Sequence, residues 1–142
     1  MHIIIDANCS ADALTPTPKP EFSPLIRAIL EGKKKLAVGG TKQKREYMKN
    51  TKAWKYIQLL DQAGRAFLVS DIKVDEEELV IKANIPLVSD DPHLLALARL
   101  SGARILCSLD QALHTDFCNP RIISKPRGRV YQNATHENLL IR

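Results

Sequence analysis

The sequence predicts an α/β protein, a three-layer sandwich with a mainly parallel central sheet. Short apolar runs, several of them β-branched, alternate along the chain with longer segments that have helical spacing. This alternation favours βαβ units, in which helices cover both faces of a sheet. The chain has 142 residues, 44% of them apolar and 26% charged, and no internal repeat or linker. Residues 1–142 are therefore expected to form a single globular domain.

The first part of the chain is expected to hold two strands and one helix. Residues 2–6 (HIIID) are a β-branched run that ends in Asp6, as expected of a buried first strand. A proline-rich loop follows and leads into a helix over residues 24–32, with Ser23 as N-cap and a proline as its first residue. Residues 35–40 (KLAVGG) are expected to form the second strand.

The middle of the chain is expected to be mostly helical. Residues 41–63 have a helical pattern that is interrupted near Asn50, and Gly64 is a suitable stop. The short apolar run AFLV, residues 66–69, predicts the third strand. An irregular stretch over residues 70–74 is expected to follow it.

The acidic segment at residues 75–85 (DEEELVIKANI) is then expected to be a helix with its acids in the first turn. The next helix is expected to begin after Ser89 or Asp90, with a proline in its first turn, and to end just before Gly102.

The last part of the chain completes the predicted sheet. Residues 103–108 (ARILCS) are expected to be a core strand, followed by a short helix over residues 110–116. Residues 128–132 (GRVYQ) are expected to be an edge strand, and residues 135–142 a short terminal helix.

The net charge and the cysteines indicate which partners and sites to expect. The chain has 21 lysine and arginine residues and 16 aspartate and glutamate residues, which gives a formal net charge of +5. This charge suits a polyanionic partner, but it is also common in proteins without one. The three cysteines lack the paired spacing of a zinc site, and Cys107 is expected to be a core residue. Because no signal-peptide layout or membrane-length apolar run is found, a cytoplasmic location is expected.

Carboxylates recur at the ends of the predicted apolar elements. Asp6 ends the first strand, Asp110 follows the strand at 103–108, and Asp91 opens the helix that leads into that strand. In parallel sheets, functional groups gather beyond the carboxyl ends of strands, so these three acids are expected to lie close together. Each also has an ordinary interpretation, because acids near a helix N-terminus act as caps.

Other charged residues are open to two interpretations. If residues 42–52 form one helix, four cations fall within an arc of about 80° that Glu46 borders. Such a face is either a surface helix with internal ion pairs or a phosphate-binding face beside a catalytic acid. The four cations are Lys42, Arg45, Lys49 and Lys52. The acids Glu76, Glu77, Glu78 and Asp116 are expected to be solvated.

Four sequence segments together resemble the PIN-domain family of small metal-dependent nucleases. These are IIIDAN, GGTKQKREY, SDDPHLLALARLSGARILCSLD, and PRGRVYQ with the following His136. The third is the most specific, because acid, helix, Gly-Ala turn, strand and acid follow in the family's order and spacing.

The resemblance implies a catalytic pocket of four acids, Asp6, Glu46, Asp91 and Asp110. It implies that Asp6, Asp91 and Asp110 bind Mg²⁺ or Mn²⁺, which are hard ions that prefer oxygen ligands. The residues expected around the pocket are Asn8, Ser108, Asp90 as the helix cap, and Asp116 as a further acid. Lys42, Arg45, Lys49 and Lys52 would then contact the substrate.

By the same resemblance, the chain is expected to be an endoribonuclease that acts as a homodimer. The resemblance also allows for a toxin role, with an antitoxin protein as partner. Two other functions stay open on the residues alone. One is a non-catalytic RNA-binding module that uses the same basic face. The other is a phospho-accepting signalling domain, which also gathers acids at the ends of parallel strands. Such a domain needs a lysine late in the chain close to these acids, and Lys125, which follows a loop, is a poor candidate.

Overall fold

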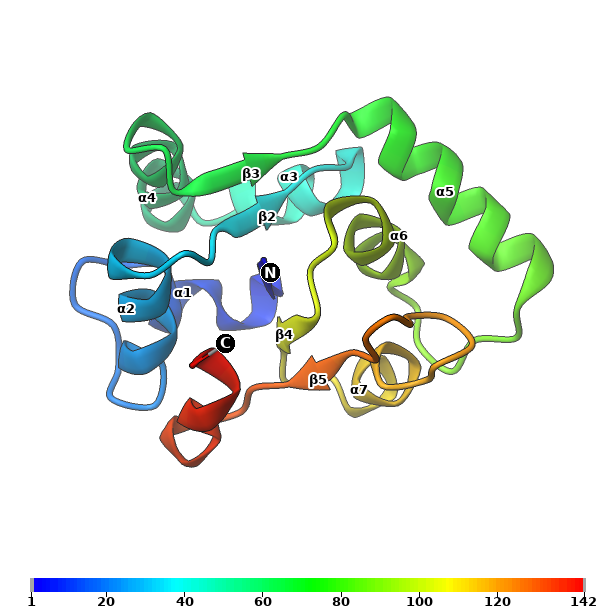
Figure 1. The fold of residues 1–142 in the computed structure, drawn as a ribbon. Coiled ribbons are helices and arrows are strands. Elements are labelled where there is room, and N and C mark those ends of the chain that lie inside the picture. Colours follow the sequence, from blue (N-terminus) through cyan, green and yellow to red (C-terminus); the bar gives the residue numbers. More distant parts are fainter. Residues whose placement is uncertain (1, 142) are drawn as a thin grey trace.

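The computed structural model describes residues 2–141 and contains a five-stranded, all-parallel sheet (Figure 1). The strand order is β3-β2-β1-β4-β5, with β1 and β4 in neighbouring central positions. The strands are β1 (Ile3–Ile5), β2 (Leu36–Val38), β3 (Ala66–Leu68), β4 (Ile105–Cys107) and β5 (Arg129–Val130). All five predicted strands are confirmed, and β5 lies at an edge, as its sequence indicated.

The helices occupy the segments between the strands. They are η1 (Ala7–Cys9), α1 (Ser10–Ala13), α2 (Ser23–Glu31), α3 (Thr41–Met48), α4 (Thr51–Gln62), α5 (Asp71–Asn84), α6 (Pro92–Ser101), α7 (Gln111–Phe117) and η2 (Ala134–Leu140), where η denotes a 3₁₀ helix. None of these helices, within residues 2–141, has the length and apolar character required to cross a membrane.

Alternation along the strands creates two hydrophobic cores, one on each face of the sheet. Ile3 and Ile5 pack with residues of α2, α3 and α4, whereas Ile4 packs with residues of α5, α6 and α7. Figure 1 shows α2 and α4 on one side of the sheet and α5, α6 and α7 on the other. Buried side chains on both faces explain why the strands are uninterrupted apolar runs. The predicted three-layer sandwich is confirmed.

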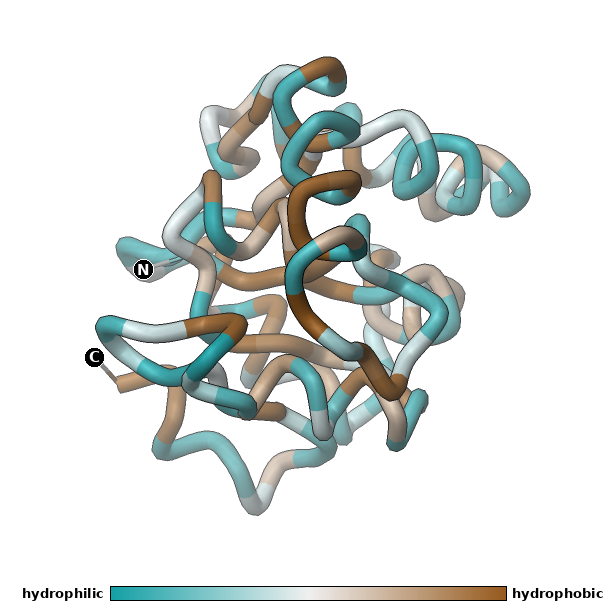
Figure 2. Tube along the Cα trace, turned by 90° about the vertical axis from the view of Figure 1, so that its right-hand side faces the viewer, coloured by the Kyte–Doolittle hydropathy of each residue, from teal (hydrophilic) through white to brown (hydrophobic). Residues whose placement is uncertain are grey.

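Helix α6 is buried almost all round, because it packs against the sheet and α5 and shares its hydrophobic core with α7. Residues 92–98 are all buried, and Figure 2 shows brown, hydrophobic segments through the centre of the molecule and teal segments on the outer helices. Cys107, which is 1% exposed, is confirmed as a core residue.

Several helix ends lie at the residues where the sequence predicted them. Asn50 separates α3 from α4 and caps α4, since its Oδ1 accepts the Ala53 N–H at 3.1 Å. Gly64 and Gly102 have φ values of 73° and 76°, a left-handed conformation that glycine adopts without steric cost.

Three local predictions are wrong. Residues 70–74 are not irregular, because Ser70 caps α5 by accepting the Lys73 N–H. Ser23 is inside α2 and Phe22 is the N-cap; the Ser23 hydroxyl donates instead to the Lys19 carbonyl. Residues 42–52 span two helices, so Lys52 is on α4 and does not continue the face of α3.

Candidate metal-binding carboxylate site

The site forms where β1 and β4 end side by side. Ile5 is paired with Cys107 in the parallel ladder, so the next residues, Asp6 and Ser108, emerge at the same edge of the sheet. The Ser108 hydroxyl donates to Asp6 Oδ2 at 2.7 Å, and the Asp6 N–H donates to the Cys107 carbonyl at 2.8 Å. Strand pairing therefore joins two residues that are about a hundred positions apart in the chain.

Asn8 and Asp110 complete this edge. The Ser108 hydroxyl oxygen accepts the Asp110 N–H at 3.1 Å and an Asn8 amide N–H at 3.4 Å. Asp110 is the N-cap of α7, since its Oδ1 accepts the N–H groups of Ala112 and Leu113. These bonds use one carboxylate oxygen of Asp110.

Asp91 reaches the same place from α6. It is the N-cap of this helix, yet within residues 2–141 no helix amide donates to its side chain. Burial raises the pKa of Asp91 to about 6, with further contributions from the nearby carboxylates of Asp6, Glu46 and Asp110. Such a shift indicates that several carboxylates compete for one small volume.

Asp90 was expected to cap α6, and this prediction is wrong. Its neighbour Asp91 occupies the N-cap position because Pro92, with its fixed φ, already lies in the first turn, and Asp90 is exposed.

Asp116 is not solvated, which corrects a second expectation. It is 2% exposed, and its carboxylate accepts the N–H of Val88 at 3.1 Å and the N–H of Ser89 at 2.8 Å. It therefore holds the segment that leads to Asp91.

Asp116→Ala is expected to lower the free energy of unfolding by about 1–3 kcal/mol, because the amide of Ser89 is buried and would lose its acceptor. Chemical denaturation measures this loss. Asp116→Asn keeps one side-chain oxygen and should lose less. Equal stability of the alanine variant and the wild type would contradict this role.

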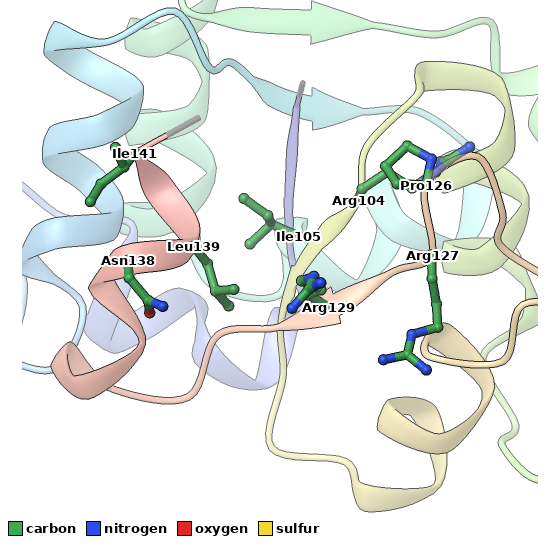
Figure 3. A pocket seen from close by; sticks show the side chains of 8 residues that line it. All are labelled: Arg104, Ile105, Pro126, Arg127, Arg129, Asn138, Leu139 and Ile141. Carbon is green, nitrogen blue, oxygen red and sulfur yellow. The ribbon is translucent and has the colours of Figure 1, made fainter.

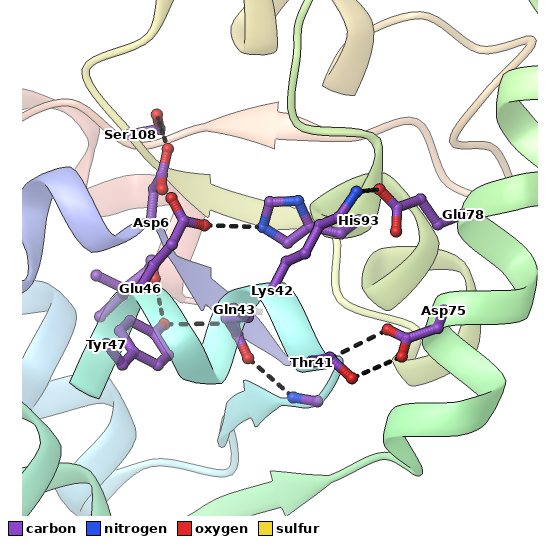
Figure 4. Close-up of polar contacts among 12 residues, drawn as sticks. Asp6, Thr41, Lys42, Gln43, Glu46, Tyr47, Asp75, Glu78, His93 and Ser108 are labelled. Carbon is purple, nitrogen blue, oxygen red and sulfur yellow. Dashed lines mark hydrogen bonds and ion pairs between the residues drawn. The ribbon is translucent and has the colours of Figure 1, made fainter. Parts of the chain in front are cut away.

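Helix α3 places Glu46 opposite Asp91. The Tyr47 hydroxyl donates to the carbonyl of Ile5, the residue before Asp6, and the Gln43 side-chain oxygen accepts the Gly39 N–H at 2.8 Å (Figure 4). These buried bonds lock α3 against the ends of β1 and β2. Glu46, one residue before Tyr47, is thereby directed to the carboxylate site.

His93 is a site residue that the sequence reasoning missed. It lies on α6 two residues after Asp91, is 3% exposed, and has its Nε2 3.1 Å from Glu46 Oε1 (Figure 4). This contact lacks hydrogen-bond geometry, and neither ring nitrogen has a hydrogen-bond partner among residues 2–141. The available signal was a histidine in the first turn of an otherwise apolar helix, next to two acids.

The donor set fits a divalent cation. Glu46, Asp91 and His93 each offer one ligand atom, and these three atoms lie within 4.8 Å of one another. Burial lowers the pKa of His93 despite the nearby Glu46, so its imidazole is neutral near pH 7. Asp6 lies close enough for its charge to act on Asp91 and His93, and Asp110 lies close enough to raise the pKa of Asp91.

The metal-free protein is expected to lose stability as the pH rises from about 4 to about 6. In this window folded Asp91, whose pKa is about 6, keeps a proton that the unfolded chain has released at its ordinary pKa of about 3.9. Burial also raises the pKa of Asp6, and this effect outweighs the opposing effect of the Ser108 hydrogen bond. Asp6 therefore also lowers the stability of the metal-free protein as the pH rises.

Melting temperatures between pH 4 and pH 7 in a chelator test this effect. The difference between Asp91→Asn and the wild type should grow with pH across the window. If the melting temperatures of the two proteins change with pH in parallel, the pKa of Asp91 is not raised by neighbouring carboxylates.

The predicted substrate cations occupy different surroundings. The Lys42 ammonium lies 2.6 Å from a carboxylate oxygen of Glu78, which is buried (Figure 4). Arg45, in the second half of α3, and Lys49, its C-cap, are exposed, whereas Lys52 on α4 lines a separate pocket beside α1. The expectation that Glu78 is solvated is therefore wrong, and so is that for Glu77, which pairs with Arg99 at 3.0 Å.

A basic cavity lies at the other end of the sheet (Figure 3). Its volume is about 600 Å³, and its basic lining consists of Arg104, Arg127 and Arg129. Arg104 precedes β4 and Arg129 begins β5, so this cavity opens near the amino ends of the strands. The carboxylate site lies at the carboxyl ends, where ligands bind in open α/β sheets.

Comparison with known proteins leaves the family unassigned. No family model and no curated protein matches the chain. Among solved structures, the chain is similar to VapBC2 from Rickettsia felis bound to a DNA fragment from their promoter, with a TM-score of 0.48 and 14% sequence identity. The similarity covers 94% of this chain and 99% of that chain, and at this level it carries no conclusion about activity.

Proposed function

We propose that this chain is a PIN-like, divalent-metal-dependent nuclease that hydrolyses phosphodiester bonds in RNA. The observation that carries the proposal is the convergence of acids from separate segments at one edge of the sheet. Asp6 follows β1, Asp91 opens α6, and Asp110 opens α7. The Ser108 hydroxyl joins Asp6 to the Asp110 amide, and Asp6 and Asp110 both raise the pKa of Asp91. Carboxylates crowded without a cation destabilise a protein, and a bound cation relieves that cost.

The metal ligands of the proposal are the acids around Asp91. Asp6, Asp91 and Asp110 are the oxygen donors that the sequence resemblance implies, and Glu46 faces Asp91 from α3. A bound Mg²⁺ or Mn²⁺ would supply Lewis-acid polarisation of the phosphodiester and a more acidic water.

The protein's own groups orient the reaction. The Ser108 hydroxyl fixes one oxygen of Asp6, and the amides of α7 fix one oxygen of Asp110. Each acid therefore keeps one carboxylate oxygen outside these bonds, directed by a rigid element. Asp91 has a pKa of about 6 in the metal-free protein and can exchange a proton with water near neutral pH. Arg45 and Lys49, exposed on the helix that carries Glu46, are positioned to attract phosphates.

Incubation with labelled single-stranded RNA and DNA tests this function. RNA should be cleaved with Mn²⁺ or Mg²⁺ and stay intact with a chelator, and DNA should be cleaved less. Binding is measured in parallel by fluorescence anisotropy. RNA that is bound but remains intact with both metals would favour the non-catalytic RNA-binding module instead.

The homodimer, the antitoxin protein and the cytoplasmic location belong to the same proposal, because they come with the resemblance to PIN domains. Light scattering of the purified chain should give twice the monomer mass of 15.9 kDa. A monomer at all concentrations would remove the dimer and leave the nuclease proposal standing.

A further inference from the structure

We propose that His93 Nε2 is a direct nitrogen ligand of the metal, and that it makes the site prefer Mn²⁺ and Co²⁺ to Mg²⁺. This inference rests on the proposed metal site and adds to its acidic ligands a group of a different chemical class. An all-carboxylate pocket does not require a histidine, and a histidine beside it is commonly a structural residue. The contacts and distances of His93 distinguish a metal ligand from a structural histidine.

The first argument is the orientation of the ring. Nε2 lies 3.1 Å from Glu46 Oε1, although the angle is not that of a hydrogen bond, and neither ring nitrogen has a hydrogen-bond partner among residues 2–141. A structural histidine at 3% exposure would be expected to satisfy at least one nitrogen with the protein. Here a nitrogen and a carboxylate oxygen approach each other without sharing a proton.

The second argument is the spacing of the donor atoms. Two neighbouring ligands of an octahedral ion with bonds of about 2.1 Å are about 3.0 Å apart. The separation of Nε2 and Oε1 in the protein is 3.1 Å, and one ligand atom from each of Glu46, Asp91 and His93 lies within 4.8 Å of the other two. The three side chains therefore place ligand atoms around one common volume, and the His93–Glu46 pair has the spacing of neighbouring ligands on a single cation.

The third argument is the origin of the three donors. Glu46 is on α3, whereas Asp91 and His93 are on the first turn of α6, and both helices are anchored by buried contacts. Asp91 and His93 are two residues apart, so the fold brings nitrogen and oxygen donors together without a mobile loop. Such preorganisation is expected of a ligand set rather than of a surface ion pair.

The chemical consequence is selectivity. Imidazole nitrogen is a good ligand for Co²⁺ and Zn²⁺ and a weaker one for Mn²⁺, whereas Mg²⁺ prefers an all-oxygen environment. Co²⁺ should bind more tightly than Mn²⁺, in the order of the Irving–Williams series.

His93→Gln is the decisive variant, because glutamine places an oxygen close to the position of Nε2. Its affinity for Mn²⁺ and Co²⁺, measured by calorimetry, should fall by about tenfold or more, as expected for a disturbed metal site, while its Mg²⁺ affinity changes much less. A variant that had only lost structural support would lose affinity for all three ions together. His136→Gln, the same change on the terminal 3₁₀ helix, is the matched control.

Pulsed electron spin resonance of bound Mn²⁺ gives a readout that is independent of activity. The wild type and His136→Gln should show coupling to an imidazole nitrogen, and His93→Gln should lose it. His93→Asn and thermal melts check that any loss does not come from unfolding.

The outcomes separate the two proposals. Mn²⁺ bound with oxygen ligands alone, or a nitrogen signal that persists in His93→Gln, would overturn the assignment of His93 and leave the nuclease proposal intact. A wild-type protein that binds none of the three ions would overturn both.

Discussion

Asp91→Asn should nearly abolish metal-dependent RNA cleavage while raising the melting temperature of the metal-free protein. The carboxylate of Asp91 is the member of the site with the pKa raised to about 6, by burial first and then by its acidic neighbours. Its removal takes away a ligand of the proposed ion, whose contribution is several kcal/mol, so the cleavage rate should fall by about a thousandfold. The same change relieves repulsion when no cation is present. Rates with Mn²⁺ and melts with a chelator measure the two effects.

The opposite signs of these effects distinguish a functional acid from a structural one. Loss of a structural carboxylate would lower activity and stability together. Asp61→Asn, the same substitution at an exposed position of α4, is the control and should change neither quantity. If Asp91→Asn cleaves RNA at the wild-type rate, Asp91 is not a catalytic ligand.

Asp6→Asn should remove most of the stabilisation that divalent ions give to the wild type. At a free-ion concentration about a hundred times Kd, binding to the folded state alone is expected to contribute about 2.7 kcal/mol. Asparagine can still accept the Ser108 hydrogen bond, so the fold at the end of β1 should persist. Its neutral amide is, however, a much weaker ligand than the carboxylate. Denaturation with and without Mn²⁺, for wild type and variant, measures the difference.

A metal-induced stabilisation that is the same in Asp6→Asn and the wild type would exclude Asp6 from the site. Asp61→Asn again provides the control and should keep the full effect. Because only the change on adding Mn²⁺ is compared, any small effect of Asp6→Asn on the metal-free fold is subtracted.

Much of the fold could be predicted because local signals and burial agree. Residues 3–5 (III) and 105–107 (ILC) are uninterrupted apolar runs, which indicates strands covered on both faces, and Asn50, Gly64 and Gly102 mark helix ends. The beginning of α5 was misplaced because Asp71 and Ile72 have no strong helical signal, and the cap at Ser70 becomes evident only with the helix in place. Ser23 failed as a cap because the turn at Lys19 and Phe22 already starts α2.

The site could be predicted in outline only. Strand ends are readable from sequence, so Asp6 and Asp110 were expected at one edge of the sheet. The surroundings of Glu78 and Asp116 could not be read, because they are buried by partners far away in sequence, Lys42 and the amides of Val88 and Ser89. His93 was missed for the same reason, since its importance depends on Glu46, which α3 brings to it.

The most direct test of the central claim is a crystal structure with Mn²⁺, in which anomalous scattering locates the ion. The claim is that Asp91 and its neighbouring acids form one cation site at the carboxyl ends of β1 and β4. It predicts an anomalous peak within coordination distance of an Asp91 oxygen, with Glu46 and at least one of Asp6 and Asp110 in contact directly or through water. A well-ordered crystal in saturating Mn²⁺ that has no peak among these acids would contradict it.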